Sequence, residues 1–195
     1  MPTGVGIRDA GERLFDAAER VLLRDGPDAL TSRAVTAEAG VAKGVLHRHF
    51  DDFDAFLAEF VLDRVDRMDA QAATLLQSAG TGTVVGNLSD ALTAVFGSVA
   101  VAIVPLITFR DELRARLRQT WPAGVPVLTE AVVMVASYLT VERGLGRIAA
   151  DADIDTLAPT LIGAAHLLFA DRTGIPPEPG AVRKMVTTVL AGVLP

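Results

Sequence analysis

The stretch 39-AGVAKGVLHRHF-50 places a turn glycine, Gly40, before a short polar run, and this arrangement decides the fold. Small and apolar residues at helical spacing lie on both sides of the glycine. They are Val35, Ala39, Val41, Leu46 and Phe50. Thr31 is a suitable N-cap for a first helix that ends near Ala39, and a second helix is expected from about Ala42 to His49. Two short helices joined by a glycine turn form a helix-turn-helix.

The exposed positions of the second helix suit a recognition helix, which lies in the major groove of DNA. Lys43 and Arg48 can meet phosphate or guanine, and Gly44 removes side-chain bulk so that the backbone can approach. Residues 31–50 hold three basic residues against one glutamate, although the whole chain has a net charge of −6. The alternative is an ordinary polar face on a small helix. The residues expected to touch DNA are Thr31, Arg33, Lys43, Gly44, Val45, His47, Arg48 and His49.

The two histidines of this stretch do not form a metal site. His47 and His49 are two residues apart, so on a helix they point in different directions, unlike histidines at i and i+4. The chain has no cysteine, and the third histidine, His166, is far away in sequence. No nucleophile–base pair is evident, and 80-GTGTVVG-86 lacks the lysine and the preceding strand of a phosphate loop. We therefore expect no metal, no cofactor and no enzymatic activity.

The rest of the chain is predicted to be helical. Half of the 195 residues are hydrophobic and 5% are aromatic, a composition that favours helices packed through small and branched side chains. Helices are expected over residues 9–25, 53–78, 87–103, 106–119, 125–149, 155–172 and 179–193, with Pro105 as one of the breaks. The prediction is an all-α protein of about nine helices. A three-helix domain, residues 1–52, precedes a larger helical domain, residues 53–195.

One apolar run leaves a second interpretation open. Residues 91–109 carry no charge over 19 positions, close to the roughly 20 that span a bilayer. The run contains Thr, Ser, Gly and Pro and has no basic flank on its N-terminal side, which favours a buried core helix. The alternative is a helical interaction or membrane-associated module without DNA binding. Because the chain lacks cysteine and its start does not resemble a secretory signal, we expect a cytoplasmic protein.

The stretch 30-LTSRAVTAEAGVAKGVLHRHFDDFDAFL-57 resembles the N-terminal DNA-binding segment of TetR-family transcriptional regulators, and the preceding helix fits it too. The resemblance is specific over about residues 9–60. The positions that match the family pattern are Thr31, Ala39, Gly40, Val41, Gly44, Leu46, His49 and Phe50.

Four positions depart from that pattern. Ala42 stands where the family has a capping serine, Val45 where it has threonine, and His47 where it has a phosphate-binding tyrosine. Phe53 replaces a lysine that anchors the fourth helix to the DNA backbone. Loss of a cap weakens a helix end by about 1 kcal/mol. We expect DNA binding that depends more on Lys43, Arg48 and Arg33.

The resemblance also implies a homodimer that binds a two-fold symmetric operator. In the family the last two long helices form the dimer interface. Two recognition helices then lie about one turn of DNA apart, roughly 34 to 36 Å. The alternative use of these apolar residues is a core within the chain. The residues expected at the interface are Leu161, Ala165, Leu168, Val186, Val189, Leu190 and Val193.

The larger domain is expected, by the same resemblance, to hold a small-molecule effector. The function implied is a repressor that a small hydrophobic effector releases from its operator, with the fourth helix as the lever. The apolar helices from residue 87 to 149 suggest a hydrophobic pocket, although core packing is the commoner use of such residues. The residues expected at the pocket are Phe96, Phe109, Arg110, Trp121, Glu130, Met134, Ser137 and Tyr138.

Overall fold

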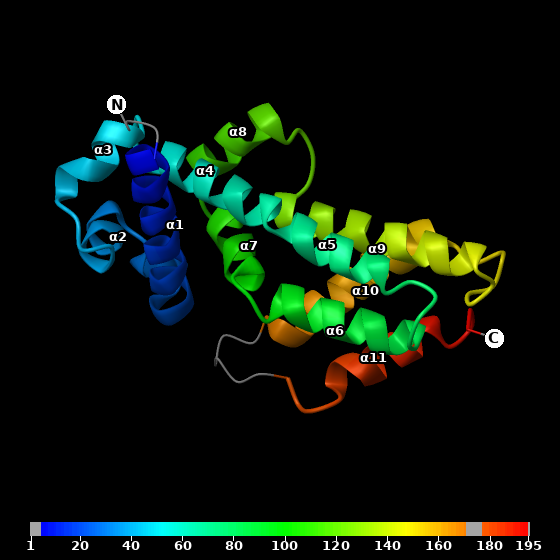
Figure 1. The fold of residues 1–195 in the computed structure, drawn as a ribbon. Helices are drawn as coiled ribbons and strands as arrows, with labels where there is room; N and C mark the ends of the chain where they lie inside the picture. Colours follow the sequence, from blue (N-terminus) through cyan, green and yellow to red (C-terminus); the bar gives the residue numbers. More distant parts are fainter. Residues whose placement is uncertain (1–4, 171–176, 195) are drawn as a thin grey trace. The chain divides into compact units, whose positions relative to one another are not determined.

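The structure is a computed structural model that describes residues 5–170 and 177–194 of the chain. Over these residues it is helical and contains no strand, which confirms the all-α fold class (Figure 1). Two 3-10 turns, at Pro27–Ala29 and Lys43–Val45, accompany the helices. The helices are α1 (Val5–Asp25), α2 (Ser32–Glu38), α3 (Leu46–His49), α4 (Phe53–Asp66), α5 (Met68–Gln77), α6 (Val84–Phe96), α7 (Ala100–Thr108), α8 (Asp111–Thr120), α9 (Pro126–Gly144), α10 (Ile154–Phe169) and α11 (Ala181–Leu190).

The chain forms two compact units. Unit 1 comprises residues 1–64 and 102–124, and unit 2 comprises residues 65–101 and 125–195. Helices α1 to α3, most of α4 and of α7, and the whole of α8 therefore belong to unit 1. The predicted domain boundary after residue 52 stays a prediction.

Unit 1 is built around α1, which packs against α2. Leu14, Val21 and Leu22 of α1 are buried. An aromatic cluster extends this buried face, because the ring of Phe15 lies 6.1 Å from that of Phe50 and 5.5 Å from that of Phe56. These contacts hold the helix-turn-helix on α1 and on the first turns of α4.

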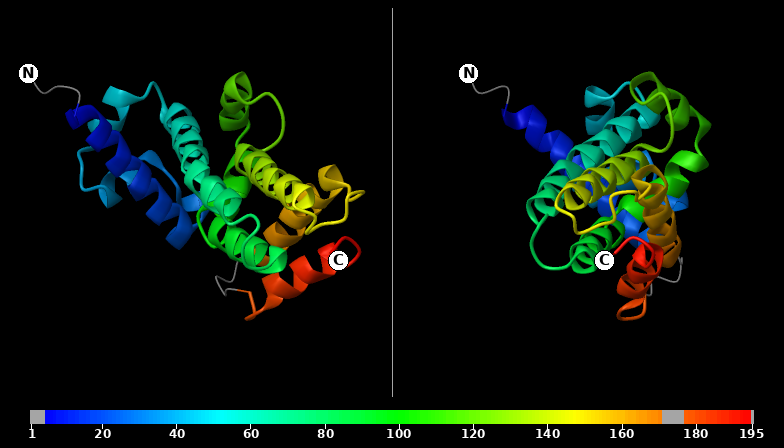
Figure 2. Two further views of the ribbon diagram at one scale, coloured as in Figure 1. Left: turned by 45° about the vertical axis from the view of Figure 1, so that its right-hand side comes forward. Right: turned by 90° about the vertical axis from the view of Figure 1, so that its right-hand side faces the viewer.

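Unit 2 is a bundle in which α9 packs against α5 and α10, and α11 packs against α6 and α10. Figure 2 shows α10 beside both α9 and α11. Leu88, Leu139 and Leu161 are completely buried in this bundle. Near the end of the described chain, the N–H of Ala149 donates to the carbonyl of Val193 at 2.8 Å. This bond ties the segment after α11 to the loop after α9.

Several predicted helix boundaries were wrong. The helix expected over residues 53–78 is divided into α4 and α5 at Arg67, and the one expected over 87–103 is divided at residues 97–99. Pro105 was predicted to separate two helices but lies inside α7. A proline inside a helix removes one backbone hydrogen bond and crowds the carbonyl four residues earlier, but Leu106 and Ile107 beside it are buried, so packing keeps the helix intact. The predicted end of α10, at residue 172, lies outside the described residues.

The apolar run at residues 91–109 is not one helix. It is shared between α6 and α7. Among residues 5–170 and 177–194, no single helix is long and apolar enough to cross a bilayer, and α6 and α7 satisfy the criteria of length and hydropathy only as an interrupted pair. The uncharged stretch instead supplies buried side chains such as Phe96 and Ile103.

Candidate functional site

The helix-turn-helix forms as the sequence predicts. Thr31 caps α2, because its hydroxyl accepts a hydrogen bond from the N–H of Ala34 at 3.2 Å. Gly40 has a φ of 65°, in the left-handed region where a side chain would be strained. Ala42, which stands where the family pattern has a capping serine, makes no side-chain cap. Residues 43–45 form a 3-10 turn before the short helix α3. We call residues 43–49 the recognition segment.

The recognition segment presents its polar side chains to solvent. Lys43, His47, Arg48 and His49 are exposed, whereas Leu46 between them is completely buried. Gly44 is also exposed and Val45 is half-buried. On the α2 side of the turn, Thr31 and Arg33 are exposed. All eight residues predicted to touch DNA therefore lie at the surface of unit 1, and their contact with DNA stays a prediction.

The only carboxylate within residues 31–50 is neutralised by α1. Glu38 accepts from Nε of Arg20 at 2.8 Å and from a guanidinium nitrogen of Arg24 at 2.9 Å. The hydrogen bonds from Arg20, and then from Arg24, lower the pKa of Glu38 below its ordinary value. The three basic residues of this stretch are therefore exposed, and the one carboxylate within the stretch is already paired with α1.

Helix α8 contacts the start of α4, which the sequence did not suggest. Asp52 caps α4, since its Oδ1 accepts from the N–H of Ala55 at 2.8 Å, and its Oδ2 pairs with Arg116. Arg110 pairs with Asp54 at 3.0 Å. Sequence reasoning missed these pairs because their members lie 56 and 64 residues apart.

A buried arginine fixes the end of α4 to α1. The side chain of Arg64 is only 4% exposed, and it pairs with Glu19 at 2.6 Å and with Asp16 at 3.1 Å. Its guanidinium carbon lies 5.1 Å from the centre of the Phe60 ring. A charge removed from water needs such partners. The contacts explain why a charged residue occupies the apolar stripe of α4.

The residues predicted for an effector pocket are divided between the two units, and their role stays a prediction. Phe109, Arg110 and Trp121 belong to unit 1, and Phe109 is 81% exposed. The other five predicted residues belong to unit 2.

A groove in unit 2 brings three of those five together. It lies between α5 and α9 and has a volume of about 160 Å³. Glu130 is its only charged lining residue, and Ser137 adds a hydroxyl. The groove is lined by Met68, Ala72, Ala73, Leu76, Glu130, Val133, Met134 and Ser137. An apolar single-ring molecule fits this volume, since a cavity of about 150 Å³ holds benzene.

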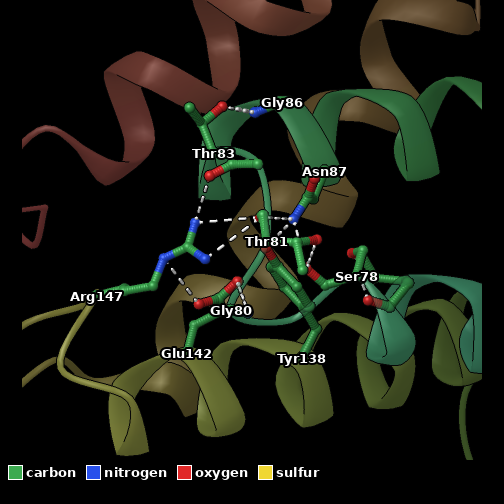
Figure 3. Close-up of polar contacts among 11 residues, drawn as sticks. Ser78, Gly80, Thr81, Thr83, Gly86, Asn87, Tyr138, Glu142 and Arg147 are labelled. Atoms are coloured by element: carbon green, nitrogen blue, oxygen red, sulfur yellow. Dashed lines mark hydrogen bonds and ion pairs between the residues drawn. The ribbon is translucent and has the colours of Figure 1, made fainter.

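Tyr138 lies in a buried polar network instead of lining the groove (Figure 3). Its hydroxyl accepts from Nδ2 of Asn87 at 3.0 Å. Burial, and secondly a hydrogen bond to Glu142, raise the pKa of Tyr138 above its ordinary value. Glu142 is completely buried, accepts from the N–H of Gly80 at 3.3 Å and pairs with Nε of Arg147 at 3.3 Å. Figure 3 shows that the network ties the loop between α5 and α6 to the end of α9.

Phe96 is also a core residue. It is 2% exposed, and its ring centre lies 6.1 Å from that of His166 and 6.2 Å from that of Phe169. Burial lowers the pKa of His166 below its ordinary value of 6.5. His166 therefore packs against Phe96 of another helix. Among the described residues there is no group of three potential metal ligands.

The residues predicted for a dimer interface are mostly buried within the chain. Leu161, Ala165, Val186 and Leu190 are completely buried in unit 2, and Leu168, Val189 and Val193 are half-buried. Leu167 is an exposed large hydrophobic residue of α10, at 77%. It lies four residues after the exposed Gly163, on the face that turns away from Leu161. The role of α10 and α11 in a dimer stays a prediction.

Comparison with known proteins gives the same picture for the N-terminal segment. Residues 14–60 match the family model for bacterial regulatory proteins of the tetR family. This range contains the helix-turn-helix and the first half of α4. No curated protein matches the chain significantly.

Solved structures share the fold along nearly the whole chain. A putative TetR-family transcriptional regulator from Mesorhizobium loti is 15% identical, with a TM-score of 0.74 over 97% of this chain and 98% of that one. NemR of E. coli in its reduced form is 14% identical, with a TM-score of 0.74 over 95% and 97%. FadR from Bacillus subtilis in complex with stearoyl-CoA is 16% identical, with a TM-score of 0.64 over 92% and 95%.

Proposed function

Because this chain belongs to the TetR family of bacterial regulatory proteins, whose members are DNA-binding transcription factors and not enzymes, we propose that it is a homodimeric repressor released from its operator by a small hydrophobic effector. It acts in the cytoplasm, where its operator DNA is found. Three features support this role: the DNA surface, an uncovered helix face and a groove for the effector.

The exposed recognition segment carries the proposal. Lys43, Arg48 and the two histidines face solvent above the buried Leu46, so the cationic side chains are held on a fixed support. Glu38, the one acid within residues 31–50, is neutralised by Arg20 and Arg24. Side chains of this kind bind phosphates and base edges when a helix enters the major groove.

The exposed face of α10 supports a homodimer. Leu167 is 77% exposed although α10 packs closely on α9 and α11, so an apolar side chain is left without cover from the described chain. A second copy related by two-fold symmetry covers such a face in a self-complementary way. Dimerisation gives the DNA site its two half-sites, about 34 to 36 Å apart.

The groove between α5 and α9 is the effector site that we propose. Its lining is apolar apart from Glu130 and Ser137, which suits a small hydrophobic molecule with one polar group. An effector that binds one arrangement of the dimer better than another shifts the population away from the DNA-competent form. Coupling of about 1 to 3 kcal/mol, or 5- to 150-fold in operator affinity, is typical.

Selection of bound sequences from random duplex DNA tests the proposal. We expect the full chain to enrich a two-fold symmetric site. The double variant Lys43→Ala and Arg48→Ala serves as the control, and we expect it to lose the enrichment because it removes two cations from the recognition segment. A wild-type protein that enriches no sequence would contradict the proposed function.

A further inference from the structure

The start of α4 places carboxylates beside the recognition segment. Asp51, Asp52 and Asp54 follow His49 within five residues. A helix in the major groove has DNA phosphates on both sides. Negatively charged carboxylates next to these phosphates repel them and weaken binding. These carboxylates therefore oppose the proposed DNA contact unless cations accompany them.

Helix α8 and the residue before it bring two arginines to these carboxylates. Arg116 pairs with Asp52, and Arg110 pairs with Asp54 at 3.0 Å. The guanidinium carbon of Arg110 also lies 5.5 Å from the centre of the Phe53 ring. All of these residues belong to unit 1, so the contacts lie within one compact body. Asp52 and Asp54 are thus paired with cations that come from the middle of the chain, and Asp51 is exposed.

Both arginines keep part of their binding capacity. A guanidinium has five N–H donors in a planar fork, and one carboxylate engages two of them at most in a bidentate pair. The side chains of Arg110 and Arg116 are 33% and 39% exposed. Each arginine therefore presents donors to solvent while its carboxylate holds it in place, which lowers the entropic cost of binding an anion.

We propose that Arg110 and Arg116 form an accessory DNA-phosphate site, in which each guanidinium holds a carboxylate of α4 on one side and a backbone phosphate on the other. The inference rests on the proposed DNA binding and extends it to α8, outside the helix-turn-helix. Contacts of this kind are independent of base sequence. They position the protein and make binding more sensitive to salt.

Fluorescence anisotropy with a labelled 30-base-pair duplex of random sequence, at a series of KCl concentrations, tests the site on the full chain. Replacement of both arginines by alanine is expected to weaken binding about tenfold or more and to reduce the salt slope by about one unit for each phosphate that is no longer bound. The variant in which both become lysine keeps the charges and is expected to retain most of the slope. Arg183→Ala on α11 removes one charge from unit 2 and is expected to leave the slope unchanged.

Asp54→Asn separates phosphate binding from a purely structural role. If Arg110 binds phosphate, this variant frees its guanidinium and removes a repulsive charge, so affinity for the duplex is expected to rise several-fold at low salt. If the ion pair only holds α8 on α4, the same variant lowers affinity or leaves it unchanged. That result would overturn the inference.

Two further outcomes are decisive. A folded double alanine variant, as judged by circular dichroism, with the wild-type affinity and slope overturns the inference while the proposed function stands. A wild-type protein that binds no duplex at low salt overturns both. If the alanine variant does not fold, Asp54→Asn still decides, because asparagine keeps a polar group of similar size at that position.

Discussion

Single residues in this chain show that burial, rather than residue type, decides between structural and functional roles. Tyr138 and Ser137 are neighbours on α9, yet Tyr138 is completely buried in a polar network and Ser137 lines an open groove. His47 and His49 are exposed beside Arg48, whereas His166 packs against Phe96. Identical side chains are therefore free for recognition in unit 1 and used for packing in unit 2.

His166 is expected to make stability depend on pH. Burial places its pKa in the folded state below the unfolded value of 6.5, so the unfolded chain binds the proton first as the pH falls. The contribution is fully present above pH 6.5 and is lost as the pH falls through the lower folded pKa. Urea unfolding at about pH 7.5 and about pH 5.5 measures the difference, which we expect to be smaller in His166→Leu than in the wild type.

His47→Leu is the matched control for that measurement, because His47 is exposed. We expect it to keep the pH dependence of the wild type. If the free energy of unfolding falls by the same amount from about pH 7.5 to about pH 5.5 in the wild type and in His166→Leu, His166 is not the titrating group.

At the scale of elements, helices in this chain end where local hydrogen bonding permits and persist where burial demands. The N–H of Gly97 makes the last i→i−4 bond of α6, to the carbonyl of Thr93 at 2.8 Å. The hydroxyl of Ser98 then donates to the carbonyl of Val95, so α6 ends although the residues on both sides are apolar. Pro105 does not end α7, because the flanking side chains are buried. Helix α10 buries one face in unit 2 and still exposes the apolar side chain of Leu167 on another.

Leu167→Lys is expected to weaken the dimer that we propose. A charge in the centre of an apolar interface must be desolvated without a partner, and it repels its symmetry mate. Sedimentation velocity is expected to show dimers for the wild type and monomers for the variant at the same micromolar concentration. Leu145→Lys, at a 55% exposed leucine directly after α9, is the control and should stay dimeric. A variant at Leu167 that sediments as the wild type does would exclude this face from the interface.

At the scale of the whole molecule, three points of the chain pass between the two units. They lie after Arg64, after Val101 and after Gly124. The proposed DNA surface is in unit 1 and the proposed effector groove is in unit 2, so any coupling between them must pass from one unit to the other. The helix break at Arg67 lies close to the first of these points.

Ser137→Trp is expected to fill the groove of about 160 Å³ and to abolish effector binding while DNA binding is kept. The probe is p-fluorotoluene, an apolar single-ring molecule, observed by fluorine NMR. The wild type is expected to broaden its resonance, and the variant to leave it unchanged. Affinity for the selected operator should be the same for both proteins. Equal broadening by the two proteins would mean that the probe binds elsewhere.

The sequence by itself determined the helix-turn-helix, because its signals are local. The Thr31 cap, the Gly40 turn and the apolar spacing around Leu46 each act within a few residues, and the structure confirms all three. The same locality made the all-α class predictable. Helix ends were predicted less well, because Arg67 carries no turn signal and Pro105 carries a misleading one.

Only the tertiary structure decided which faces of the helices are free. An amphipathic stripe shows that a residue is buried but not by which partner. The resemblance placed Leu161 and Val186 at a dimer interface, and both are completely buried within unit 2. The placement of Arg110 and Arg116 at the start of α4 was unpredictable for a related reason. The partners in these ion pairs are separated by 56 and 64 residues along the chain. Such pairs depend on the tertiary fold that brings α8 to the start of α4, and residue spacing in the sequence does not predict that fold.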